Sequence, residues 1–486
     1  MNNFFATPLK QKDAFQGLRA KLFGNFSWLF AGTAGKLIIG FIATLYLARV
    51  LGPQGFGQIA FAQAILAYFI LITDFGLQTL GTREIAVASE GKSRIVGKIL
   101  TIRFVLVIAS LGILIIFAPF FTPSTTTKYL LVIFSFTLIP MGANLAWFFR
   151  GLEKMMLVGV SDVLQVGFYL ALLLMLVKSP DQLFYVPAIF IGGHMLSTLF
   201  LSGIYAHRWG LPKLSTSIVD NWKFLSIAAP VIVTQLLHQI YFNMDIWMLG
   251  FYRSETEVGF YNAAYRVIFA IIMINTVFMQ AIYPTFSRLY RRQPLEVSKL
   301  LKKTLSLSMI FAIPIGIAGT ILSHSLIATL FGTAFANSTL AFQILVWSAS
   351  LAFLGANYGY CLVACHQQKT LAFAAGIGTA VNIVLNFLLI PSHGIIGACL
   401  ATIIAQVVMV ICESIAFSLR ISPTFPSAIL ALKASAAGLV MGLVLFYLNS
   451  YFNLFLLIII GVVVYFSILW LLGRAQLFKL LSFRIG

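Results

Sequence analysis

The sequence consists largely of apolar stretches of about 20 residues that follow one another with only short polar connections. A helix needs about 20 apolar residues to cross the roughly 30 Å hydrocarbon core of a bilayer. Hydrophobic residues make up 60% of the chain and charged residues only 9%, whereas a soluble domain carries about 25% charged residues. We therefore predict an all-α polytopic membrane protein.

The apolar stretches predict 14 transmembrane helices. Their expected positions are 25–48, 56–80, 99–119, 128–149, 156–177, 183–206, 224–250, 259–287, 304–323, 340–365, 370–390, 395–418, 427–448 and 452–472. Residues 325–338 are assigned to a loop or to an interfacial segment. No connection is long enough for a folded extramembrane domain, which argues against an enzyme with a soluble catalytic lobe.

Lysine and arginine residues gather on one side of this predicted topology. Of 32 such residues, 26 lie on or near the side that holds both termini, 4 lie on or near the opposite side, and Lys36 and Arg266 are assigned to span interiors. Cytoplasmic loops carry an excess of these residues, so we expect both termini in the cytoplasm and the chain in the plasma (inner) membrane. The net charge of +19 then reflects topology and contact with anionic lipids rather than nucleic-acid binding.

An internal repeat relates two predicted hairpins. The turn and helix start at residues 52–64 resemble those at residues 250–266, with Gly57 corresponding to Gly259 at an offset of 202 residues. This offset covers about six spans, so the two copies keep the same orientation. It predicts two parallel halves, in which Lys36 corresponds to His238. The alternative is a chance likeness between short hairpins.

Basic residues inside spans are the strongest functional signal. A charge at mid-bilayer costs about 2.5–3.5 kcal/mol, so Lys36 is expected to face protein or a water-filled cavity. Trp28, Gly32 and Lys36 share one helical face. In the second half Asn262 and Arg266 are one turn apart. We predict that Lys36 and Arg266 line a cationic chamber. The alternative is that each forms a structural ion pair.

Other polar residues within or near spans are weaker candidates. Asn382 and Asn386 share a helical face and are expected either to bind substrate hydroxyls or to form interhelical hydrogen bonds. Asp74 is expected either to pair with Arg83 or to cap a helix end. Buried carboxylates can also carry protons, although structural ion pairs are the alternative for each. The candidates for ion coupling or gating pairs are Asp74, Arg83, Asp162, Asp245, His238 and Glu413. No cysteine or histidine spacing indicates a metal site, and no cofactor is expected.

Four stretches of the sequence resemble a known family. They are LGPQGFG at residues 51–57, DFGL followed by TRE at residues 74–84, VGFYNAA at residues 258–264, and YPTFSR at residues 283–288. In order and spacing they are similar to the Wzx-type polysaccharide flippases of the multidrug/oligosaccharidyl-lipid/polysaccharide exporter superfamily. The likeness covers nearly the whole chain.

The resemblance implies two pseudo-symmetric six-helix lobes around a central cavity, plus two C-terminal helices. The corresponding segments are a basic cytoplasmic tail (1–24), an N-lobe (25–206), a cytoplasmic linker (207–223), a C-lobe (224–418), and two further helices with a tail (419–486). It also implies that polyprenyl-diphosphate-linked oligosaccharides move from the cytoplasmic to the outer leaflet for O-antigen, capsule or exopolysaccharide synthesis, without covalent chemistry.

We expect alternating access, with Lys36, Arg49 and Arg266 holding the anionic headgroup. The expected partners are the lipid-linked oligosaccharide, membrane lipids and other polysaccharide assembly proteins. One alternative is an ion-coupled multidrug antiporter of the same superfamily, which a cavity richer in acids would favour. A second alternative is a membrane glycosyltransferase or polysaccharide polymerase, which would need a sizeable extramembrane loop.

Overall fold

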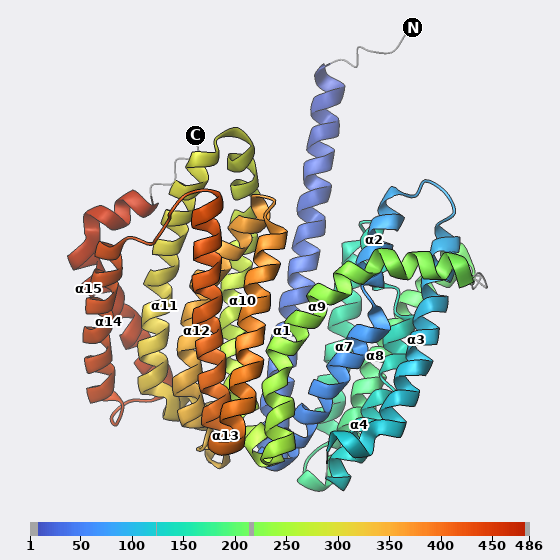
Figure 1. The fold of residues 1–486 in the computed structure, drawn as a ribbon, viewed down its shortest axis with the longest axis horizontal. Helices are drawn as coiled ribbons and strands as arrows, with labels where there is room; N and C mark the ends of the chain where they lie inside the picture. The colour runs from blue at the N-terminus through green and yellow to red at the C-terminus, as the bar shows by residue number, and fades with distance from the viewer. Residues whose placement is uncertain (1–7, 123, 213–217, 482–486) are drawn as a thin grey trace. The chain divides into compact units, whose positions relative to one another are not determined.

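The computed structural model describes residues 8–122, 124–212 and 218–481, and every regular element in these ranges is helical (Figure 1). The elements are α1 (Pro8–Asp74), α2 (Leu77–Val87), α3 (Lys92–Phe121), α4 (Thr125–Ser135), α5 (Leu138–Ala143), α6 (Ala146–Gly151), α7 (Met155–Leu176), η1 (Pro180–Gln182), α8 (Tyr185–Trp209), α9 (Ile218–Tyr252), α10 (Glu255–Arg292), α11 (Pro294–Phe331), η2 (Thr333–Phe335), α12 (Ser338–Ala364), α13 (Gln368–Arg420), α14 (Ala428–Leu448) and α15 (Leu454–Leu481).

Eleven helical segments within the described residues are long and apolar enough to cross a membrane. Two of them are more than 50 residues long. Each contains helices that meet at a glycine with non-helical backbone angles, Gly52 in α1 and Gly394 in α13. Gly52 has φ of 66° and Gly394 has φ of 54°, a region that favours glycine. The all-α polytopic class is confirmed, and the number of 14 spans stays a prediction.

The predicted span at 128–149 is not one helix. It is interrupted between α4 and α5 and again between α5 and α6. Asn144 lies in the second interruption and forms two hydrogen bonds there. Its side-chain oxygen accepts a hydrogen bond from the backbone N–H of Ala146 at 2.8 Å, and its backbone carbonyl accepts one from Arg103 at 3.2 Å. Broken helices inside a bilayer need such partners, because no water is available for the freed backbone groups.

Two segments outside the predicted spans contain helix. The predicted tail of residues 1–24 is helical from Pro8 onward, as part of α1. The segment 325–338 is not a loop throughout, since α11 continues to Phe331 and η2 follows it. Phe335 in η2 is fully buried against Phe56 and Phe260, with ring centroids 6.0 and 6.2 Å apart. Aromatic packing therefore extends the ordered structure beyond the predicted span.

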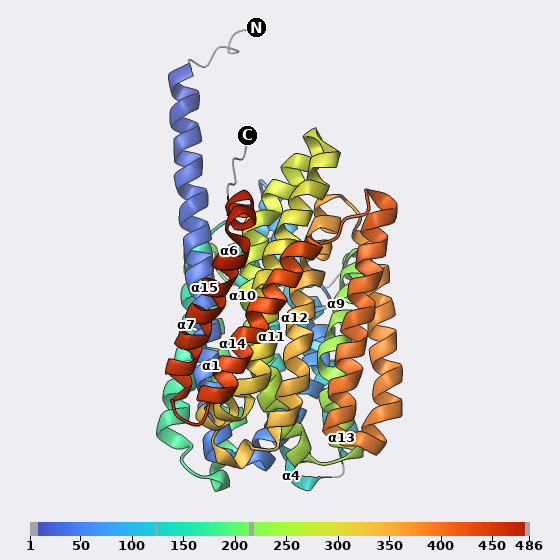
Figure 2. The same ribbon diagram turned by 90° about the vertical axis from the view of Figure 1, so that its left-hand side faces the viewer.

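The chain divides into two compact units. The first contains the chain up to Leu51 together with Ala62–Leu236, and the second contains Gly52–Phe61 together with Leu237–Gly486. An aromatic core in the first unit surrounds Trp147 and Phe148. In the second unit, α14 and α15 lie beside α11 (Figure 2). The lobe boundaries drawn from the sequence stay a prediction.

The two hairpins of the predicted repeat contact each other within the second unit. A Cβ atom on Gly57 would lie 1.7 Å from the carbonyl oxygen of Glu255, and one on Gly259 would lie 1.9 Å from the carbonyl oxygen of Pro53. Pro53 and Glu255 are related by the same offset of 202 residues as Gly57 and Gly259. Each glycine therefore contacts the repeat counterpart of the residue that the other glycine contacts. Such a reciprocal contact is what a two-fold axis produces, and it supports the repeat.

Candidate functional site

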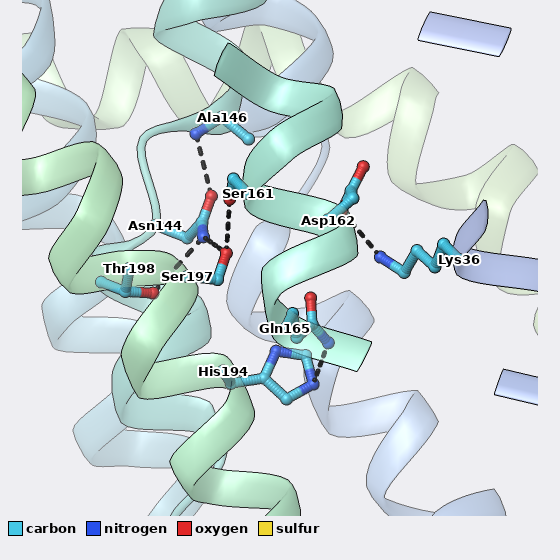
Figure 3. Close-up of polar contacts among 9 residues, drawn as sticks. All are labelled: Lys36, Asn144, Ala146, Ser161, Asp162, Gln165, His194, Ser197 and Thr198. Atoms are coloured by element: carbon cyan, nitrogen blue, oxygen red, sulfur yellow. Dashed lines mark hydrogen bonds and ion pairs between the residues drawn. The ribbon is translucent and has the colours of Figure 1, made fainter. Parts of the chain in front are cut away.

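Lys36 lies in an ion pair whose position is set by a glycine crossing in the first unit. A Cβ atom on Gly32 of α1 would lie 2.5 Å from Cα of Gly159 in α7, so the two backbones are in direct contact. One turn further along both helices, Nζ of Lys36 lies 2.9 Å from Oδ1 of Asp162 (Figure 3). Asp162 is one of the acids that the sequence analysis named as candidates for ion coupling or gating pairs. The Lys36 side chain is still 42% exposed and that of Asp162 21%.

Hydrogen bonds continue along α7 from this ion pair (Figure 3). One turn after Asp162, the side chain of Gln165 bonds to His194 of α8, with 3.0 Å between the nitrogen atoms. On a neighbouring face, Ser161 bonds to Ser197 of α8 at 2.6 Å, and Asn144 lies 3.4 Å from the same hydroxyl. The helices α1, α7 and α8 are thus joined by polar contacts inside their apolar lengths.

A second ion pair in the first unit is buried. The carboxylate of Asp74 lies 3.3 Å from the guanidinium of Arg103, and these side chains are 11% and 3% exposed. The predicted pair of Asp74 with Arg83 is wrong, because Arg83 bonds to Glu84 instead. Arg103 lies near the start of the predicted span at 99–119, and the structure buries it within α3.

Asp245 of α9 is the centre of a polar cluster in the second unit. Its side chain is buried and accepts hydrogen bonds from Tyr261 at 2.6 Å, from Thr402 at 2.8 Å and from Asn386. Asn386 also donates to Asn382 at 3.1 Å. Both asparagines are fully buried, and Asn386 joins α13 to α9 through Asp245. Contact of these asparagines with substrate hydroxyls stays a prediction.

The buried acids of the second unit have no basic partner among the described residues. No lysine, arginine or histidine in those residues lies within ion-pair distance of Asp245 or Glu413. Glu413 is 5% exposed, and its Oε2 has no hydrogen-bond partner in the described chain. Asp74 and Asp162 of the first unit, by contrast, are both paired with cations.

The remaining predicted site residues are not part of these clusters. Arg266 is half-buried on α10 and has interactions of its own, while the amide nitrogen of Asn262 is buried without a partner among the described residues. Arg49 is exposed and also engaged by other groups. His238 is exposed, with its ring 4.4 Å from that of Phe242. Trp28 is 49% exposed.

Several residues of these clusters were missed by sequence reasoning. Arg103 was missed because it lies near the expected edge of a span, where a cation is unremarkable. Tyr261 and Thr402 carry no charge, and uncharged polar residues are too frequent in spans to stand out. The broken helix at Asn144 had a readable signal, since Pro140 and Gly142 precede it.

Two family models match the chain. The model described as "Polysaccharide biosynthesis protein" matches residues 22–290, and the model described as "MatE" matches residues 230–388. The first covers more than half of the sequence. The two matches overlap in α9 and α10, and together they extend from α1 into α13.

Relatives and solved structures agree with these matches. The chain is 24% identical over 395 residues to a protein of Escherichia coli (strain K12) named "Putative O-antigen transporter", covering 79% of this chain and 93% of that protein. It is 25% identical over 286 residues to the "Probable low-salt glycan biosynthesis flippase Agl15" of Haloferax volcanii, covering 56% and 60%. The solved structure titled "Lipid II flippase MurJ, inward closed conformation" has a TM-score of 0.77, 18% identity, and coverage of 92% and 99%. That likeness shows the fold.

Proposed function

We propose, since the chain belongs to the polysaccharide biosynthesis protein family, that it is a flippase for polyprenyl-diphosphate-linked oligosaccharides. The resemblance to Wzx-type members of the exporter superfamily is thereby confirmed. The observation that carries the proposal is that likeness to the O-antigen transporter extends over 93% of that relative. The likeness thus extends over nearly the whole of that relative rather than over one part of it.

The Lys36–Asp162 pair supports a role in holding the anionic headgroup. A charge that faces lipid costs about 2.5–3.5 kcal/mol, so the exposed edge of this pair is expected to face water or protein. A half-exposed ion pair contributes only about 0–1 kcal/mol. Lys36 can therefore exchange Asp162 for a diphosphate oxygen at little cost. In the second half, Arg266 would bind two phosphate oxygens with its planar guanidinium.

Asp245 is the residue we assign to ion coupling. A buried carboxylate without a basic partner is costly, and it is stabilised when it takes up a proton or a monovalent cation. Tyr261, Thr402 and Asn386 supply neutral polar atoms around it. Uptake and release of that cation would bias the transporter between its inward-open and outward-open states.

Topology supports transport from the cytoplasmic leaflet outward. The excess of basic residues on one side favours cytoplasmic termini and insertion in the plasma (inner) membrane. The glycan would cross with its diphosphate in the protein interior and its polyprenyl tail in the bilayer. Other polysaccharide assembly proteins are expected to supply and consume this substrate.

Reconstitution of the full-length protein in liposomes tests the function. We expect the protein to accelerate movement of a polyprenyl-diphosphate-linked oligosaccharide between leaflets. The substrate is added to the outer leaflet, and the measured quantity is the fraction of glycan that an enzyme outside the liposomes can no longer cleave. Liposomes without protein give the background rate. Absence of acceleration, combined with gradient-driven uptake of a cationic drug, would instead favour the antiporter alternative, for which the MatE match at residues 230–388 is the supporting observation.

A further inference from the structure

A hollow of about 740 Å³ lies in the first unit at the ends of two candidate spans. It lies where α7 begins and α8 ends, so it is at the membrane–water boundary rather than in the bilayer centre. Its apolar lining includes Met155, Met156, Leu157 and Ile204, and its polar lining consists of Glu153, Lys154, His207 and Arg208. An apolar floor with a basic rim is suited to an amphiphile with a negative headgroup.

The two basic residues Lys154 and Arg208 at this rim have no carboxylate partner among the residues that the structure describes. The pKa of Lys154 is lowered, first by partial burial and then by repulsion from Arg208. Glu153 is the one acid of the lining, and it has interactions of its own. The rim therefore has an excess of positive charge that an anion would relieve.

Aromatic residues hold Lys154 at this rim. Its ammonium lies 5.2 Å from the ring centroid of Trp209, within the range of a cation–π interaction. Trp209 in turn stacks on Tyr205, with centroids 5.6 Å apart, and meets Phe148 edge-on at 5.1 Å. Tyr205 and Phe148 belong to the core of the first unit. The cation is thus positioned by a fixed aromatic wall.

We propose that this hollow binds the phosphate headgroup of an anionic lipid, with the lipid chain lying along Met155, Leu157 and Ile204. Basic pockets at the cytoplasmic ends of spans are suited to such headgroups. The uncapped start of α7 adds the positive end of a 22-residue helix to the same rim. The site does not depend on the transport function, because it requires only a phosphate on an apolar chain.

Two membrane sources supply that chemistry: anionic phospholipids and polyprenyl diphosphates. We would measure retention of phosphatidylglycerol, undecaprenyl diphosphate and inorganic phosphate by the purified full-length protein, using native mass spectrometry. The test variant is Lys154→Gln with Arg208→Gln. Its matched control is Lys92→Gln with Arg94→Gln, which removes two cations from the same predicted side but outside the hollow.

We expect the test variant to bind phosphatidylglycerol roughly ten- to thirtyfold more weakly, with the control variant and the melting temperature unchanged. If undecaprenyl diphosphate displaces phosphatidylglycerol from wild type but not from the test variant, the lipid-linked substrate is the source of the headgroup. Equal phosphatidylglycerol retention by wild type and test variant would overturn the site. So would equally tight binding of inorganic phosphate, because the apolar floor would then be irrelevant.

Discussion

At the scale of single residues, the acids of the two units differ in what surrounds them. Asp162 and Asp74 are paired with Lys36 and Arg103, whereas Asp245 is surrounded by neutral donors. Pairing a carboxylate with a cation removes the need for a mobile counter-ion. A carboxylate without a paired basic side chain is suited to take up and release a cation during transport.

Replacement of Asp245 tests this assignment. We expect Asp245→Asn to remove the dependence of the initial translocation rate on a sodium or proton gradient, while leaving thermal stability equal or higher, because an uncompensated buried charge is gone. Asp181→Asn is the control, since Asp181 is exposed in η1. A variant that keeps the gradient dependence of the wild type would exclude Asp245 as the coupling group.

Sequence reasoning identified the charged residues more readily than their partners. Lys36 stands out because a cation in an apolar span is costly. Its pairing with Asp162, however, depends on the contact of Gly32 with Gly159, which are far apart in sequence. The neutral partners of Asp245 were missed for the same reason, because three-dimensional proximity gives them their role.

At the scale of elements, apolar length predicted most helices, while interruptions were harder to predict. The breaks around α5 and the extension of α11 to Phe331 depend on side-chain contacts rather than hydropathy. The hairpin contact between Gly57 and Gly259 was anticipated only as a likeness of sequence. Its close backbone approach explains why both positions are glycine.

Any side chain at these glycines should disturb the hairpin contact. We expect Gly57→Ala and Gly259→Ala each to lower stability by about 1–3 kcal/mol, because the added methyl group would lie less than 2 Å from a carbonyl oxygen. Thermal unfolding of the purified protein measures this effect. Gly112→Ala is the matched control, since nothing lies within 4 Å of its added Cβ. Equal melting temperatures for all three variants would contradict the contact.

At the scale of the whole molecule, the sequence predicted class, membrane topology and family resemblance from length, charge and short motifs. The all-α multi-pass fold and the family are confirmed, while cytoplasmic termini and the lobe boundaries stay predictions. Sequence reasoning did not predict that residues 52–61 join the second compact unit although they lie within the first half of the chain. That assignment arises from the reciprocal hairpin contact.

The central claim is that intramembrane cations bind the diphosphate of the passenger. The most direct test is the translocation rate of a polyprenyl-diphosphate-linked oligosaccharide in proteoliposomes containing wild type, Lys36→Ala or Arg266→Ala, with the exposed Lys178→Ala as control. Loss of one charge-assisted hydrogen bond of about 1.5–3 kcal/mol predicts a reduction of about tenfold or more for both variants and none for the control. Wild-type rates in both folded variants would contradict the account.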